Sequence, residues 1–301
     1  MLRPIALLIL AVFCLSFGSV IAKGLLTGGF GISIPNIEPL PFLASQFVGS
    51  LGFLFVVALV NRKRFDLGRS LKGLVIAGTI LGAGSVGTIM ALVFIPVSEA
   101  SVIFATQPIL IIGLAWLLLS ERMNAATLLL GAVAIAGVLV IVLNGETGQA
   151  NNRALGALFA TFSTVSAALY FVWMRRLSTT TDTLYATIIV QFTAFTVVVV
   201  VWVTAKIFGI NVGGFPPASS FSAAAMSGLC YYGLGFYIFL LGLKHIEAGR
   251  AGLYLNLVPV FTIALAYVLL SERLTLVQWI GAAIVLCAVV AISKSALSKR
   301  T

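Results

Sequence analysis

Two amide side chains lie beside prolines in the apolar part of this 301-residue sequence. Gln107 directly precedes Pro108, and Asn256 stands three residues before Pro259. A proline inside a helix removes one backbone hydrogen bond and frees the carbonyl four residues earlier. An amide next to such a carbonyl can either bind a solute or pair with a neighbouring helix. We expect helix kinks at both prolines, with Asn256 and Gln107 as candidate solute-binding residues.

Further hydroxyl groups lie in the middle of long apolar runs. Tyr232 and Tyr237 share one run, Tyr170 lies in another, and Ser85 and Ser19 lie in two more. Tyrosine rings can form the wall of a site for a planar or amphipathic solute, or they can pack with the hydroxyl bonded to a neighbouring carbonyl. Serine hydroxyls often bond to their own helix. These five residues are further candidates for non-covalent binding.

Residues for covalent or metal chemistry are sparse. The chain has one histidine, His245, and each of its eight acidic residues lies at the end of an apolar run or in a loop. Its three cysteines are widely spaced, at positions 14, 230 and 287. Catalysis needs a nucleophile with a base or paired acids. We therefore expect no enzyme activity, no metal and no cofactor, and no deep carboxylate relay for protons.

The overall composition explains where these side chains must lie. Hydrophobic residues make up 61% of the chain and charged residues only 9%, with a mean hydropathy of +1.17. Soluble domains carry about 25% charged residues. This balance excludes a soluble enzyme, a disordered protein and a nucleic-acid-binding protein. It indicates a multi-pass membrane protein in contact with lipid, with no evident need for a protein partner.

Charged residues divide the sequence into segments of membrane-spanning length. The charge-free stretches are 4–22, 39–61, 73–98, 100–120, 123–145, 154–174, 183–205, 207–243, 251–271 and 274–293. About 20 apolar residues are needed to cross the bilayer as a helix. Only 207–243 is too long, and its start is rich in Gly, Pro and Ser, so we expect its helix to begin near Phe221. The prediction is an all-α integral membrane protein with ten transmembrane helices.

The distribution of positive charge predicts the orientation. With ten spans, fourteen of the eighteen Lys and Arg residues fall on the side that holds both termini, and four fall on the other. Positively charged loops remain in the cytoplasm. We therefore expect both termini to be cytoplasmic. The net charge of +10 then reflects topology and contact with anionic lipid headgroups.

The chain contains an internal repeat. Residues 108–122 (PILIIGLAWLLLSER) align without gaps with residues 259–273 (PVFTIALAYVLLSER), with nine identities at an offset of 151 residues. The same offset places Gly82-Ala-Gly84 on Gly233-Leu-Gly235. We therefore divide the chain into two five-helix halves, 1–148 and 151–301. Because five is odd, the second half is inverted, and inverted repeats allow two symmetry-related states, which indicates a transporter.

The repeated pattern resembles a known family. Each half has a proline-centred span, a Leu-Leu-Ser-Glu-Arg run and then a glycine-containing span, and the first span contains Ser16-Phe-Gly-Ser-Val-Ile-Ala-Lys23. In these features it is similar to the EamA-type transporters of the drug/metabolite transporter superfamily. It differs in having Phe17 before the first-span glycine, where that family often has Trp, and Gln46 where it often has Arg. The resemblance implies a ten-helix carrier of the bacterial inner membrane.

These observations lead to one functional expectation and several alternatives. We expect a secondary transporter that moves a small neutral or zwitterionic metabolite, such as an amino acid or vitamin, by alternating access, with export the direction that the resemblance implies. An uptake carrier for a vitamin-like aromatic solute and a lipid flippase remain alternatives. A membrane-embedded enzyme is disfavoured, because no acid lies deep in a span and His245 lies in a loop.

Overall fold

The computed structural model describes residues 2–26, 38–61, 70–95, 97–121, 123–143, 152–178, 181–210, 212–270 and 275–298. The positively charged segment 62–69 and the second Ser-Glu-Arg run at 271–273 lie outside these residues, as do the side chains of Lys23 and Glu99. The described chain is helical because a backbone inside lipid must satisfy its own hydrogen bonds, which a helix does within one segment.

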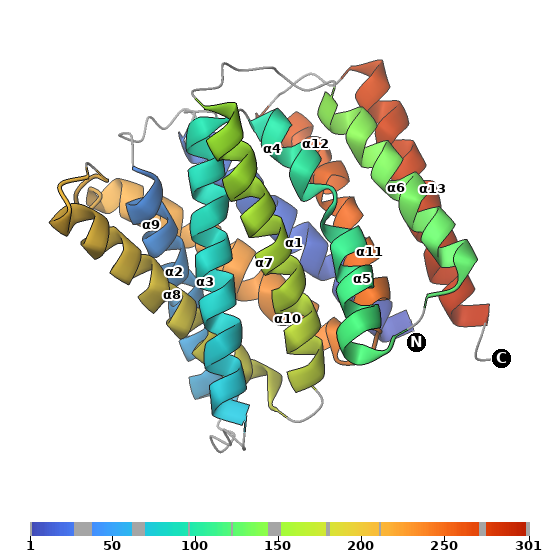
Figure 1. Cartoon of the computed structure of the whole chain (residues 1–301), viewed down its shortest axis with the longest axis horizontal. Helices are drawn as coiled ribbons and strands as arrows, with labels where there is room; N and C mark the ends of the chain where they lie inside the picture. Colours follow the sequence, from blue (N-terminus) through green and yellow to red (C-terminus); the bar gives the residue numbers. More distant parts are fainter. Residues whose placement is uncertain are drawn as a thin grey trace.

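The helices follow one another in the order that Figure 1 shows. They are α1 (Leu2–Leu26), α2 (Pro39–Asn61), α3 (Leu71–Phe94), α4 (Val97–Phe104), α5 (Gln107–Leu119), α6 (Ala125–Leu143), α7 (Arg153–Leu177), α8 (Thr183–Ile207), α9 (Ala218–Gly228), the π-helix η2 (Leu229–Gly235), α10 (Phe236–Leu243), α11 (Ala248–Leu253), the 3-10 helix η3 (Tyr254–Asn256), α12 (Leu257–Leu270) and α13 (Leu276–Ser298).

The prediction of ten spans is confirmed. Within the described residues, ten helical segments are long and apolar enough to cross a membrane. Span 4 combines α4 with α5, span 8 combines α9, η2 and α10, and span 9 combines α11, η3 and α12. Span 8 begins at Ala218, close to the expected start at Phe221. We call the end of the bundle where α1 begins and α13 ends the termini end, and the other the opposite end (Figure 1).

Span 8 packs very closely against α1 and α2. A methyl group at Gly49 would lie 1.9 Å from the backbone oxygen of Ala225, and one at Gly228 would lie 2.0 Å from that of Gln46. A methyl group at Gly18 of α1 would lie 2.7 Å from the backbone nitrogen of Tyr231. Glycine at these positions lets the helix backbones touch. Because α12 also packs on α1, these helices form one group, which we call the α1 bundle (α1, α2 and spans 8 and 9).

A second group of helices has the same arrangement. It consists of the helices that the offset of 151 residues relates to those of the α1 bundle. Glycines 78 and 82 of α3 contact α8, and glycines 84 and 87 contact α7, each so closely that an added methyl group would lie within 3.0 Å of a neighbouring atom. Span 4 packs on α7 through both α4 and α5. We call α3, α7, α8 and span 4 the α7 bundle. Each bundle therefore combines spans from both repeats.

The two remaining helices, α6 and α13, pack on each other at one edge of the molecule (Figure 1). They cross at a pair of glycines: a methyl group at Gly137 would lie 2.9 Å from the backbone oxygen of Gly281, and one at Gly281 would lie 2.8 Å from that of Gly137. The groove beside this crossing is lined by apolar residues together with the Cys287 thiol. This pair flanks the two bundles, and its Ser293 hydroxyl lies 2.8 Å from the hydroxyl of the buried Tyr254 in span 9.

Candidate functional site

The middle of span 8 is a π-helix, which the sequence did not predict. Regular α-helical spacing would group Tyr232, Phe236 and Phe239 on one face. The π turn η2 changes this spacing, so that Tyr231 also contacts Phe236, with ring centroids 5.8 Å apart across five residues. Single π turns are rare and occur frequently at functional sites. The turn lies where span 8 faces both α1 and α2.

Tyr232, at the centre of this turn, joins the two bundles. Its ring stacks on Phe47 of α2 with centroids 4.4 Å apart, inside the α1 bundle. Its hydroxyl donates a hydrogen bond to Ser85 Oγ on α3 of the α7 bundle, with the oxygens 3.2 Å apart. Both residues are buried. The structure thus brings together two of the residues that the sequence proposed separately.

Gln191 on α8 is a site residue that sequence reasoning missed. Its side chain is fully buried, and its Nε2 donates a hydrogen bond to the backbone oxygen of Tyr232 at 3.1 Å. This amide supports a carbonyl inside the π turn, while its own Oε1 has no partner among the described residues. The available signal was an amide isolated in the apolar run 183–205. Both the hydroxyl and the carbonyl of Tyr232 therefore bond to the α7 bundle.

Helix interruptions lie just before both prolines. In span 4, α4 ends at Phe104 and α5 begins at Gln107, so that Pro108 occupies the first turn of α5. In span 9, η3 separates α11 from α12, and Pro259 follows it by three residues. A proline is tolerated in the first turn of a helix because the missing N–H would be unpaired there. The breaks occur at equivalent positions of the two repeats.

The two amides beside these breaks differ in their surroundings. Asn256 is 3% exposed, and its Nδ2 donates a hydrogen bond to the backbone oxygen of Leu253, at 3.1 Å, in its own span. Gln107 is half-buried, and its side chain forms no hydrogen bond within the described chain. Tyr237, on α10, is likewise half-buried and without a described hydrogen-bond partner. The structure therefore does not gather these three predicted residues around one shared set of hydrogen bonds.

Tyr170 and Ser19 occupy equivalent positions of the two repeats, separated by the offset of 151 residues. Tyr170 is fully buried and packs against the rings of Phe171 and Phe236, with centroid distances of 5.2 and 5.7 Å. Its hydroxyl has no hydrogen-bond partner among the described residues. Ser19 is half-buried, and its hydroxyl donates a hydrogen bond to Leu15 in its own helix, at 3.0 Å.

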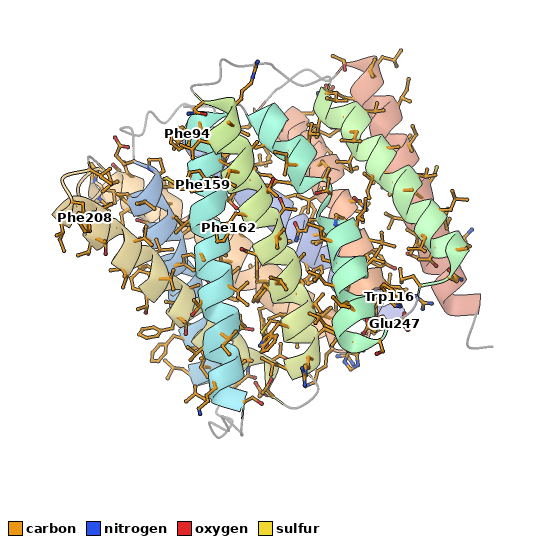
Figure 2. The ribbon with its side chains drawn as sticks, in the orientation of Figure 1. Phe94, Trp116, Phe159, Phe162, Phe208 and Glu247 are labelled. Carbon is orange, nitrogen blue, oxygen red and sulfur yellow. The ribbon has the colours of Figure 1, made fainter. Side chains whose placement is uncertain are left out.

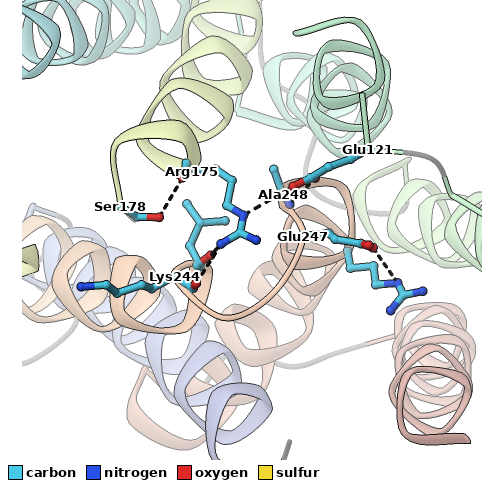
Figure 3. Close-up of polar contacts among 8 residues, drawn as sticks. Glu121, Arg175, Ser178, Lys244, Glu247 and Ala248 are labelled. Carbon is cyan, nitrogen blue, oxygen red and sulfur yellow. Dashed lines mark hydrogen bonds and ion pairs between the residues drawn. The ribbon is translucent and has the colours of Figure 1, made fainter. Parts of the chain in front are cut away.

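A charged network closes the termini end (Figure 3). Arg175 of α7 donates hydrogen bonds from Nη1 to the backbone oxygens of Leu243 and Lys244, at 2.9 and 2.8 Å, where α10 ends. Glu121, which follows α5, accepts a hydrogen bond from the backbone N–H of Ala248, at 2.7 Å, where α11 begins. Arg175 Nε and Glu121 Oε1 lie 3.4 Å apart. Each charge stabilises the helix end that suits its sign.

This network connects the two bundles. Arg175 and Glu121 both belong to the α7 bundle, and the backbone groups that they bind belong to the α1 bundle. Neighbouring charges play other roles: Glu247 pairs with Arg250 on α11 itself, at 3.2 Å, and Lys244 Nζ donates to the backbone oxygen of Thr181, at 3.4 Å. The sequence did not indicate that Arg175 would bind the backbone oxygens at the end of α10.

The two ends of the bundle differ in packing. At the termini end, α5 packs on α11, and Gly249 and Gly252 fit against Ile112 and Ile111. The repeat-related pair at the opposite end is α12 and α4, and within the described residues these helices are not comparably packed. At that end, Phe94 and Phe159 stack within the α7 bundle, with centroids 5.9 Å apart (Figure 2). The termini end is therefore the more closed end.

Comparison with known proteins identifies the family. Two stretches of the chain, residues 2–143 and 154–294, match the EamA-like transporter family. The chain belongs to this family. It is 23% identical over 265 residues to the uncharacterized transporter YoaV of Bacillus subtilis (strain 168), covering 86% of this chain and 88% of that protein. This EamA-like transporter is thus a multi-pass membrane protein of the drug/metabolite transporter superfamily.

A solved structure supports the same fold for this EamA-like transporter. One solved crystal structure of a protein matches this chain with a TM-score of 0.77 and 19% sequence identity, over 96% of this chain and 98% of that one. At this identity the likeness concerns the fold.

Within the described residues, no three His, Cys, Asp or Glu side chains gather in a way that could hold a metal ion.

Proposed function

We propose that this EamA-like transporter is a secondary carrier that moves a small neutral or zwitterionic metabolite across a bacterial inner membrane by alternating access. The observation that carries the proposal is the unequal packing of repeat-related helices, α5 with α11 at one end and α12 with α4 at the other. Inverted repeats can exchange these two arrangements, and each exchange would open one end and close the other.

The glycine contacts support a particular pair of moving bodies. Backbones that touch at Gly49, Gly228 and Gly18 leave no room for sliding side chains, so we treat the α1 bundle as one body. The α7 bundle, joined through the α3 glycines, is the other. Between them lie the packing of α2 on α8 and of α11 on α5, the bonds of Tyr232 and the Arg175–Glu121 network. Transport would then rock the bundles about the middle of span 8, breaking the network when the termini end opens.

The chemistry of the interior supports an uncharged or zwitterionic solute. In the described spans, charged side chains lie only near the span ends. A permanent charge on a solute would therefore find no opposite charge at the membrane centre. The proposed binding groups are the uncharged ones, namely Asn256, Tyr237, Tyr232, Gln107, Ser85, Tyr170 and Ser19. We further propose that the termini end faces the cytoplasm, because it collects most of the Lys and Arg residues.

Efflux from proteoliposomes tests this proposal. Vesicles are loaded with a panel of neutral amino acids, nucleosides and vitamins, and the retained solutes are measured by mass spectrometry with and without a pH gradient. Protein-dependent loss of one class is expected. A gradient of the same solutes in the other direction tests uptake. If folded protein moves none of them and instead scrambles labelled phospholipids, the proposal is wrong and the flippase alternative replaces it.

A further inference from the structure

The repeat relates Tyr170 and Ser19, so that each lies toward a different end of the bundle. They are repeat-equivalent residues on α7 and α1, which run in opposite directions (Figure 1). Tyr170 precedes Arg175 by five residues, which is about 7.5 Å along a helix. It therefore lies just inside the network that closes the termini end. By the symmetry of the repeats, Ser19 lies at the same depth toward the opposite end.

The Tyr170 hydroxyl is a buried polar group without a structural task. The residue is fully buried, and among the described residues no group accepts from or donates to its hydroxyl. Leaving such a hydroxyl unpaired in an apolar interior is unfavourable, and phenylalanine would fill the same space without that cost. A tyrosine at this position is therefore explained if its hydroxyl has a partner in another state.

One aromatic ring of the other bundle covers this hydroxyl-bearing side chain. Phe171 is the next residue on α7, whereas Phe236 belongs to the α1 bundle, and both rings pack on Tyr170. Separation of the bundles at the termini end would lift Phe236 away and expose Tyr170. The same movement would close the opposite end over Ser19, which is half-buried in the present state and bonds to its own helix.

We infer that the Tyr170 hydroxyl is a solute-binding group that acts only when the termini end is open. This inference rests on the proposed carrier function and adds sidedness to it. The partner is an uncharged hydrogen-bonding group, such as a carbonyl, amide or hydroxyl, on a solute whose planar or apolar part lies against Phe171 and Phe236. Ser19, its equivalent toward the other end, offers a smaller side chain whose hydrogen is already donated. The solute therefore binds more tightly from the termini end.

Binding to two conformationally biased proteins tests the inference. Cysteines 14, 230 and 287 are first replaced by alanine. Ile112→Cys with Gly249→Cys, oxidised to a disulfide, then locks α5 to α11, because an added Cβ at Gly249 would lie 3.6 Å from Ile112 Cα. Glu121→Ala biases the protein the other way by removing one side chain that joins the bundles. Binding of the neutral amino acid, nucleoside and vitamin panel is measured for both by mass spectrometry.

The expected effect of Tyr170→Phe depends on the state. In the Glu121→Ala protein it weakens binding about three- to tenfold, the loss expected for one neutral hydrogen bond. In the disulfide-locked protein it leaves binding unchanged. The matched control is Tyr267→Phe, because Tyr267 is 51% exposed on α12. The melting temperature of the Tyr170→Phe protein should stay constant or rise, which a structural hydrogen bond would not allow.

The failures of the two proposals can be distinguished. In the Glu121→Ala background, equal solute binding by the protein with Tyr170 and by the Tyr170→Phe variant would overturn the inference. The proposed carrier function would then still stand. Absence of binding and transport for every panel solute would instead overturn the proposed function. A second measurement needs no solute: Tyr170→Cys should react with an impermeant maleimide in the Glu121→Ala background and not in the locked protein. Equal reactivity in the two proteins would overturn the inference.

Discussion

Glu121→Ala is expected to open the termini end by weakening the network between the bundles. Glu121 contacts Arg175 at 3.4 Å and the backbone N–H of Ala248 at 2.7 Å, and alanine removes both contacts. Arg175 loses its ion-pair partner at the same time. Because Ala248 begins α11, the variant also removes a negative charge from the positive end of that helix.

The size of the effect follows from the burial of the pair. Hydrogen bonds to charged groups contribute about 1.5–3 kcal/mol each when well buried, and exposed ion pairs about 0–1 kcal/mol. The two side chains are 19% and 15% exposed, so that an intermediate value applies. About 1–2 kcal/mol for both contacts together corresponds to about a 5- to 30-fold shift of the ratio between open and closed forms.

The assay measures how fast a reagent reaches the closed interface. In a protein whose native cysteines are replaced, the cysteine of Gly249→Cys lies on α11 against Ile112, at a position that is buried while the termini end is closed. An impermeant maleimide should label it about 5- to 30-fold faster after Glu121→Ala, in proportion to the open fraction. The matched control is Glu247→Gln. It removes a negative charge from the same end of the bundle, but Glu247 pairs with Arg250 of α11 and does not join the two bundles. If both variants label at the same rate, the network does not hold the bundles together.

Three further variants test packing and hydrogen bonding in span 8 by thermal melting of the purified protein. Gly228→Ala should lower the free energy of unfolding by about 1–3 kcal/mol or prevent folding, because its methyl group would lie 2.0 Å from a backbone oxygen. The control Gly52→Ala, which has open space around it, should leave this free energy unchanged. Equal melting temperatures of the two variants would contradict close packing at Gly228. Gln191→Leu should lower the free energy of unfolding by about 0.5–1.5 kcal/mol, because it removes the buried hydrogen bond to the Tyr232 carbonyl, whereas the exposed Thr196→Val should change it little. Tyr232→Phe should lower the free energy of unfolding by about 0.5–1.5 kcal/mol. Adding Ser85→Ala to this variant should lower the free energy almost no further, whereas full additivity of the two losses would show that the two hydroxyls act separately.

The sequence predicts the number and order of the spans well, because charged residues are excluded from the hydrocarbon and mark most boundaries, while Gly, Pro and Ser residues mark the start of span 8. The offset of 151 residues likewise predicts the repeat, since identities such as Pro108 and Pro259 lie at the same place in each half. These are properties of single helices or of the chain compared with itself. They do not depend on knowing which helices are neighbours.

The contacts of the site depend on helix neighbours and could not be predicted in the same way. Tyr232 and Ser85 were both recognisable as hydroxyls at membrane depth, but their pairing follows from packing between spans 8 and 3. The carbonyl of Tyr232 in the π turn accepts a hydrogen bond from the amide of Gln191, which is distant in sequence. Arg175 has the ordinary appearance of a charge at a span end, and only the folded chain places the end of α10 beside it.

The exchange of helices between the repeats has a consequence for synthesis of the chain in the cell. The glycine face of α3 matches α7 and α8, which are made only after α3 has entered the membrane. The amino-terminal half, on leaving the ribosome, therefore has an unpaired helix surface that its own spans do not cover. Co-expressing residues 1–148 and 151–301 as separate polypeptides should yield a stable complex, while either piece alone should be degraded by membrane proteases.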